Sequence, residues 1–226
     1  TEIYTLSLHD ALPIYGSNAH IRIPEEPQGL AFIAPGAAVS PNDPLIQSVR
    51  RACEDKGMAT VVADLSQTQL ITDDPNHVNG HFVTELKNII DGYMADNEYT
   101  PDTFELIGHS MGGSAALMIA QDYPVSALTL LDPTPVSTET LEGIESPTTI
   151  IVSNVRSFKA SGRRMASTLE DTGALTALHE IDTSTERNSG HRFVGATDAI
   201  EDIIRSQDIA PPAPTPPEDN LDKPEQ

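Results

Sequence analysis

Short apolar runs alternate with stretches of helical periodicity along most of the chain. Apolar runs of strand length lie at 29–34, 59–65, 103–108, 126–131, 148–153 and 174–181. Apolar residues recur at helical spacing in the segments 43–57 and 82–93, and the segment 114–120 is apolar on all sides, as in a helix packed in the middle. A polar helix at 159–171 and a last helix at 196–206 complete the pattern. Strands that alternate with helices are joined by right-handed crossovers. The pattern therefore predicts an α/β fold, with a mostly parallel central sheet and helices on both of its faces.

Both ends of the chain differ from this pattern. Residues 1–14, TEIYTLSLHDALPI, resemble the conceptual translation of sequencing-adapter DNA, and we expect this leader to be foreign to the domain. Residues 209–226 are rich in proline and acidic residues and carry too little apolar surface to form a core, which predicts a disordered tail. The expected folded domain spans residues 15–208.

Composition and charge narrow the range of partners. The chain of 226 residues has 34 acidic and 13 basic residues, a formal net charge of -21. Such a surface repels phosphate backbones, so we expect no nucleic-acid partner. No apolar run approaches the roughly 20 residues that span a bilayer, and we expect a cytoplasmic protein. The single cysteine, Cys53, excludes an internal disulfide and forms no cluster with metal-ligand spacing.

The hexapeptide Gly-His-Ser-Met-Gly-Gly at 108–113 lies between a predicted strand and a predicted helix. Glycine and serine are common in turns, so one interpretation is purely structural. In the other interpretation it is a nucleophile elbow, a sharp strand-to-helix turn that exposes a reactive serine. The loop follows the carboxyl end of a strand, where open parallel sheets bind their ligands, and this favours the elbow.

A strand, Gly-x-Ser-x-Gly and a helix of small residues, in this order, resemble the α/β-hydrolase superfamily. The resemblance covers about residues 28–206 and implies that Ser110 is a nucleophile. Gly108 and Gly112 provide the room that so sharp a turn needs. His109 occupies the variable position, and we expect it to pack or hydrogen-bond locally without a catalytic role.

A serine hydroxyl needs a positioned base, and the superfamily supplies a histidine after its last strand. Here the strand at 174–181 leads into a loop that contains Gly190 and His191. Of the seven histidines, only His191 has both the right order in the chain and the right kind of loop. It is the predicted base.

Two aspartates compete for the role of the acid that orients this histidine. Most members of the superfamily carry the acid after the strand that here is 148–153, where the matching position is Arg156. Asp132, at the end of the preceding strand, resembles the acid of thioesterase domains, chlorophyllases and some lipases. Asp182 is the rival, nine residues before His191 in the same loop. We predict Asp132 as the acid, with an Asp-Pro turn as its structural alternative.

The resemblance also implies an oxyanion hole made of two backbone N–H groups. One belongs to Met111, which follows the nucleophile. The other comes from the loop at 34–38, where Pro35 has no N–H to give, so Ala37 is the predicted donor and Gly36 allows the turn.

The predicted substrate site is open. Only about fifteen residues separate the strands at 126–131 and 148–153, too few for a helical lid domain. The loop at 72–80 is expected to form one wall, with Asn76 and His77, beside Gly36, as candidate substrate contacts; their other interpretation is as ordinary turn formers.

These residues predict a lidless serine hydrolase that cleaves a small-molecule acyl ester or thioester through an acyl-enzyme intermediate. The reaction needs no metal or organic cofactor. An inert α/β-hydrolase scaffold that acts as a binding protein, and an amide hydrolase, are the alternatives. The sequence does not indicate an oligomeric state.

Overall fold

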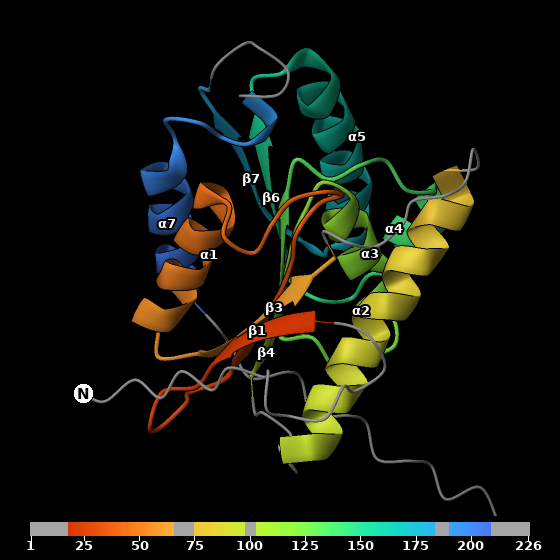
Figure 1. The fold of residues 1–226 in the computed structure, drawn as a ribbon. Helices are drawn as coiled ribbons and strands as arrows, with labels where there is room; N and C mark the ends of the chain where they lie inside the picture. The colour runs from red at the N-terminus through yellow and green to blue at the C-terminus, as the bar shows by residue number, and fades with distance from the viewer. Residues whose placement is uncertain (1–17, 66–74, 98–102, 184–189, 209–226) are drawn as a thin grey trace, which may run out of the picture.

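The computed structural model describes residues 18–65, 75–97, 103–183 and 190–208 (Figure 1). The leader at 1–14 and the tail at 209–226 lie outside the described residues, so their assignments stay predictions. No helix in these ranges is long and apolar enough to cross a membrane.

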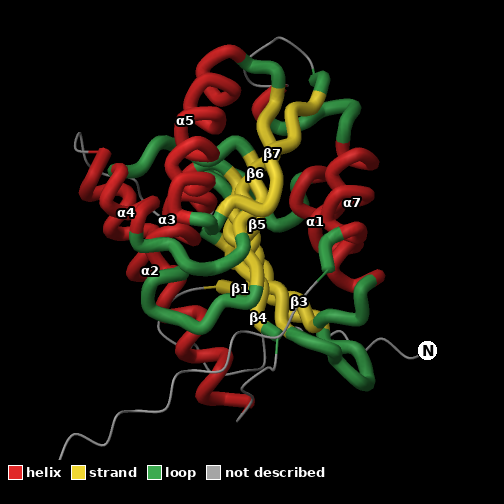
Figure 2. The backbone as a smooth tube through the Cα atoms, turned by 180° about the vertical axis from the view of Figure 1, so that it is seen from behind, coloured by secondary structure: helices red, strands yellow, loops and turns green. Residues whose placement is uncertain are grey.

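The described residues form one seven-stranded sheet at the centre of the molecule (Figure 2). The strands are β1 (Asn18–Arg22), β2 (Leu30–Ala34), β3 (Ala59–Asp64), β4 (Phe104–His109), β5 (Ala127–Leu131), β6 (Thr148–Ser153) and β7 (Leu175–Ile181). Their spatial order is β1-β3-β2-β4-β5-β6-β7. β1 pairs antiparallel with β3, and every other pair is parallel.

Helices cover both faces of this sheet (Figures 1 and 2). They are α1 (Pro44–Asp55), α2 (Pro75–Asn97), α3 (Met111–Ile119), α4 (Thr138–Glu142), α5 (Arg156–Thr172) and α7 (Thr197–Ser206). α1 and α7 pack side by side on one face, and α2 to α5 lie on the other. The chain steps from β2 to β3 in one direction and then from β3 to β4 in the other. Because both crossovers are right-handed, α1 and α2 lie on opposite faces.

The structure confirms the predicted α/β architecture and corrects three details. β1 was not predicted, because it is a short, largely polar edge strand. α4 was not predicted either, because its five residues are too few to show a period. The interpretation of 72–80 as a loop is wrong from Pro75 onward, where α2 begins. Its first turns, PNHVNG, lack apolar periodicity, although a proline at the first helical position is a common start.

Two apolar clusters, one on each face, hold the layers together. The larger contains Phe82 of α2, Leu117 of α3 and Leu169 of α5. The smaller joins α1 and α7 to the opposite face, for example through Val49 and Ile200. β2, β4 and β6 are buried along their whole lengths. β2 is a continuous apolar run, whereas β4 and β6 also bury polar residues, among them His109 and Ser153.

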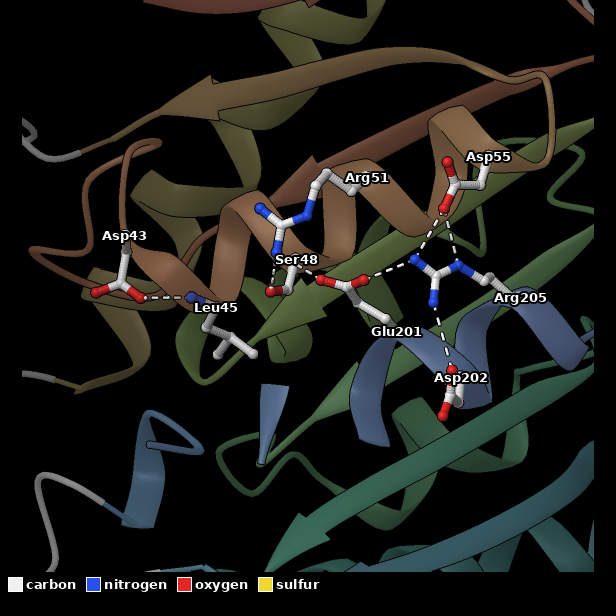
Figure 3. A network of polar contacts seen from close by, with 8 residues as sticks. All are labelled: Asp43, Leu45, Ser48, Arg51, Asp55, Glu201, Asp202 and Arg205. Atoms are coloured by element: carbon white, nitrogen blue, oxygen red, sulfur yellow. Dashed lines mark hydrogen bonds and ion pairs between the residues drawn. The ribbon is translucent and has the colours of Figure 1, made fainter. Parts of the chain in front are cut away.

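A polar network joins α1 to α7 at the rim of the smaller cluster (Figure 3). Glu201 of α7, only 7% exposed, accepts hydrogen bonds from Arg51 of α1 at 2.5 Å and from Arg205 at 2.6 Å. Arg205 also donates to Asp55 at 2.8 Å. Burial alone would raise the pKa of Glu201, but hydrogen bonds from Arg51, Ser48 and Arg205 outweigh it and hold that pKa below its usual range. The carboxylate therefore stabilises the fold above its unfolded pKa, and this contribution is lost as the pH falls.

We expect Glu201→Gln to lower the free energy of unfolding by about 1 to 2 kcal/mol at pH 7, because it removes the charge that two guanidinium groups share. Urea denaturation monitored by circular dichroism measures the change. Asp202→Asn is the matched control: Asp202 is 80% exposed at its side chain and contacts the same Arg205 at 3.3 Å. We expect it to cost less than about 0.5 kcal/mol. Equal costs for the two variants would contradict the assignment.

Candidate active site

The site lies where the strand order reverses direction. β2 is followed in the chain by β3 on one side, whereas β4 pairs with β2 on the other. At such a switch point the loops that leave neighbouring strands diverge, and a crevice forms outside their carboxyl ends. Here those loops are 34–38 after β2 and the turn at Ser110 after β4.

Ser110 forms the sharp turn between β4 and α3. Its backbone has φ 56° and ψ -121°, a conformation that residues other than glycine rarely adopt. A Cβ at Gly108 would lie 2.5 Å from the carbonyl oxygen of Gly112, and one at Gly112 would lie 2.1 Å from that of Ala34. Only glycine fits at both positions, as the elbow interpretation requires. The amide of Ser110 donates to the carbonyl oxygen of Leu131 at 2.9 Å, which fixes the turn to β5.

Asp132 and His191 lie within hydrogen-bond distance of each other. The Nδ1 atom of His191 is 3.1 Å from Oδ2 of Asp132. Asp132 follows β5 directly and has no exposed surface, whereas the side chain of His191 is 20% exposed. Asp182, the rival acid, follows β7 and is exposed. The structure thus brings together His191 and Asp132.

Ser153, at the carboxyl end of β6, completes the surroundings of this aspartate. Its backbone N–H donates to Oδ1 of Asp132 at 2.8 Å, and its hydroxyl donates to Oδ2 at 2.6 Å. The sequence predicts no role for Ser153. Its role depends on the pairing of β5 with β6, which the sequence alone does not specify.

His109 packs against His191 and holds its main chain. The two ring centroids are 4.6 Å apart, and Nε2 of His109 lies 2.9 Å from the carbonyl oxygen of His191. A carbonyl only accepts, so Nε2 carries the hydrogen and donates. Complete burial, and then the nearby His191, lower the pKa of His109 to about 3. The ring is therefore neutral at neutral pH, and the expectation of a local hydrogen bond is confirmed.

The loop at 34–38 packs against the elbow. A Cβ at Gly36 would lie 2.9 Å from Cβ of Ser110, so this glycine allows the close approach. The N–H groups of Ala37 and Met111 have no hydrogen-bond partner among the described groups. Met111 is the first residue of α3, where backbone N–H groups point out of the helix toward any negative charge.

A cleft of about 540 Å³ opens beside these residues. It is lined by Ala37, Val39, His109, Ser110, His191, Arg192 and Val194. Ser110 and His191 thus face the same space, although the Ser110 hydroxyl makes no hydrogen bond to a described residue. Gly36 does not line the cleft. Asn76 and His77 belong to the first turn of α2, and their side chains lie outside the described part of the structure.

No cluster of His, Cys, Asp or Glu suited to a metal ion occurs among the described residues. Between β5 and β6, where every residue is described, the chain forms only α4 and its flanking turns, so this connection carries no lid domain.

Comparison with solved structures identifies the fold. No family model and no curated protein matches the sequence. A dienelactone hydrolase from Anabaena variabilis is similar in structure, with a TM-score of 0.72 and 21% identity over 90% of this chain and 95% of that one. An α/β serine hydrolase without a lid from Xanthomonas campestris gives a TM-score of 0.66 and 15% identity over 91% and 93%. Carboxyl esterase 2 from Tuber melanosporum gives 0.64 and 13% over 91% and 84%. The chain has the α/β-hydrolase fold in its lidless form.

The neutral state of His109 predicts a pH-dependent stability. The unfolded chain binds a proton at this histidine below its ordinary pKa of 6.5, whereas the folded chain does so only near 3, so stability falls as the pH falls between these values. The protonation of His109 in the unfolded chain alone should lower the free energy of unfolding by about 2 kcal/mol between pH 7 and pH 5. Phenylalanine does not titrate, so between pH 7 and pH 5 we expect the free energy of unfolding of His109→Phe to fall by about 2 kcal/mol less than that of wild type. Urea denaturation at the two pH values measures both. An equal loss in both proteins would show that His109 is not held neutral.

Proposed function

We propose that the chain is a serine hydrolase that cleaves carboxylic esters or thioesters through an acyl-enzyme. One observation carries the proposal: a serine in a strained elbow faces the same cleft as a histidine whose far nitrogen is held by a buried aspartate. In the proposed triad Ser110 is the nucleophile, His191 the base and Asp132 the acid. Each corresponds to the role that the sequence predicts.

The reaction proceeds in two halves. Ser110 Oγ attacks the carbonyl carbon while Nε2 of His191 takes its proton, which forms a tetrahedral oxyanion and an imidazolium. The oxyanion collapses, the bond to the leaving group breaks, and His191 returns the proton to the leaving oxygen or sulfur. In the second half His191 takes a proton from water, whose oxygen attacks the acyl carbon. The bond to Ser110 Oγ then breaks, His191 returns the proton to that oxygen, and the carboxylic acid is released. The N–H groups of Ala37 and Met111 bind the oxyanion in both halves.

Asp132 orients the imidazole and stabilises its cation. With Nδ1–H donated to the carboxylate, Nε2 is left as the basic atom beside the cleft. The missing hydrogen bond between Ser110 and His191 does not argue against this assignment, because catalytic hydrogen bonds are often long before substrate binds.

The substrate class follows from the cleft and the similar structures. The connection between β5 and β6 is too short to carry a lid domain, which suits flexible or bulky acyl groups. The names of the similar proteins, a dienelactone hydrolase and a carboxyl esterase, favour an ester over an amide. An inert scaffold used for binding is less well supported, because it would not need a strained serine or a held imidazole.

A fluorophosphonate probe tests the nucleophile. We expect the probe to label wild type once and not to label Ser110→Ala, since only an activated serine attacks phosphorus quickly. Ser137→Ala is the control, because Ser137 caps α4 and is exposed. Mass spectrometry of the intact protein measures the labelling. Undiminished labelling of Ser110→Ala would show that Ser110 is not the nucleophile.

The acid is tested by a pair of asparagine variants. We expect Asp132→Asn to lower kcat on a p-nitrophenyl ester by about 10⁴, because the amide supports the wrong imidazole tautomer and removes the charge that balances the imidazolium. Asp182→Asn should change kcat less than about threefold. The reverse ranking would move the acid to Asp182, and two mild effects would indicate a Ser-His dyad.

A further inference from the structure

Phe158 lies flat against the ring of His191. The two ring centroids are 3.9 Å apart, and the ring planes differ by only 3°. Phe158 is the third residue of α5, so it comes from the same strand-to-helix connection that places Ser153 next to Asp132. It is half-buried and does not line the cleft. It therefore contacts the histidine without contacting the space where substrate would bind.

We propose that Phe158 is a positioning residue that fixes the plane of the His191 ring and favours its protonated form during the reaction. The inference rests on the proposed function, in which His191 is the base.

The contact with Phe158 acts first on the orientation of the His191 ring. The hydrogen bond from Nδ1 to Asp132 holds the imidazole at one atom and leaves it free to tilt about that point. His109 holds the main-chain carbonyl of His191 and also contacts its ring, but at a tilt of 35° with 4.6 Å between the centroids. The flat contact with Phe158 fixes the plane of the imidazole ring as well. The hydrogen bond and the ring contact together fix the position of Nε2, and a small displacement of that atom would lower the reaction rate strongly.

The contact with Phe158 also acts electrostatically, on the proton that His191 takes from Ser110. The face of a phenyl ring carries partial negative charge and attracts a cation within about 6 Å of its centroid. Neutral imidazole gains little from this charge, whereas imidazolium gains more. The stack is thus stronger after proton transfer than before it, which is the condition for accelerating the step.

Other groups near His191 set the background for this effect. Asp132 faces Nδ1 and favours the cation, His109 is neutral, and Arg192 is the next residue in the chain. Arg192 lies 3.5 Å from its partner Asp43, and Lys159, beside Phe158, pairs with Glu180 at 2.7 Å. These groups are unchanged when Phe158 alone is replaced, so a variant isolates the contribution of its ring.

The test compares Phe158→Leu, which keeps apolar bulk without an aromatic face, with Phe158→Tyr, which keeps the face. The pH dependence of kcat/KM is measured on p-nitrophenyl acetate. For Leu we expect the plateau to fall roughly 3- to 30-fold and the midpoint of the acidic limb to move down by roughly 0.5 to 1.5 pH units. Tyr should stay within about threefold of wild type with its midpoint unmoved.

The direction of the midpoint separates this role from simple packing. If Phe158 only shields the histidine from water, its removal hydrates the imidazolium and moves the midpoint up. An unmoved or raised midpoint in Phe158→Leu, or a tyrosine variant as impaired as the leucine variant, would overturn the proposal. Tyr123→Leu is the matched control, because Tyr123 makes an edge contact with Phe104 at the opposite end of β4. It should leave the plateau and the midpoint unchanged.

Two further measurements keep the test decisive. Trifluorophenylalanine at position 158 keeps the shape of the ring but removes most of its facial charge, so it should lower the midpoint even if Phe158→Leu fails to fold. An NMR titration of the His191 Cε1–H signal, assigned by its absence in His191→Gln, measures the same midpoint without substrate. If wild type hydrolyses neither esters nor thioesters, the proposed function fails, and the NMR midpoint still decides whether the ring of Phe158 stabilises the imidazolium. If wild type is active and the midpoint does not move, only the role of Phe158 fails.

Discussion

A buried carboxylate is costly unless hydrogen bonds replace the water it has lost, and the site is arranged around one. Asp132 receives the amide and the hydroxyl of Ser153 and faces the ring nitrogen of His191. These partners lie 21 and 59 residues away in the chain. The aspartate therefore ties the ends of β5 and β6 to the segment before α7. If Ser153 or His191 were replaced, the buried carboxylate of Asp132 would lose some of the hydrogen bonds that replace water around it.

Backbone strain is concentrated in the same place. Among the described residues, the non-glycine residues with positive φ are Ala38, Ser110, Asp132 and Phe193. All four belong to connections at this edge of the sheet, either lining the cleft or adjacent to residues that do. Each such conformation costs on the order of 1 to 3 kcal/mol and persists only where surrounding packing imposes it. Phe193 shows how: its fully buried ring anchors the turn after His191 in the α1–α7 cluster.

The sequence predicts those parts of the site whose residues lie close together in the chain, and it misses parts that depend on contacts between distant residues. The elbow is local: Gly108, Ser110 and Gly112 lie within five residues, and the strand and helix around them have clear periods. His191 and Asp132 could be placed by their order after particular strands. Ser153 and Phe158 could not, because their roles depend on which strands are neighbours and how one ring lies on another. β1 escaped prediction for a related reason, since an edge strand is stabilised by its pairing with β3 and only weakly by its own pattern.

The net charge of -21 raises a question for a reaction that forms an oxyanion. A carboxylate a few ångströms from the developing charge would oppose it strongly in a partly buried site, whereas one beyond the Debye length of about 8 to 10 Å would matter little. Among the described residues that line the cleft, none is acidic, and the charged or titratable ones are His109, His191 and Arg192. Asp132, which is buried, has its oxygens directed to Ser153 and His191, and Asp43 lies 3.5 Å from Arg192 of the lining. In the described part of the cleft, the acids closest to the lining residues are thus paired, so the local field there can favour the oxyanion of the proposed reaction in a strongly anionic protein.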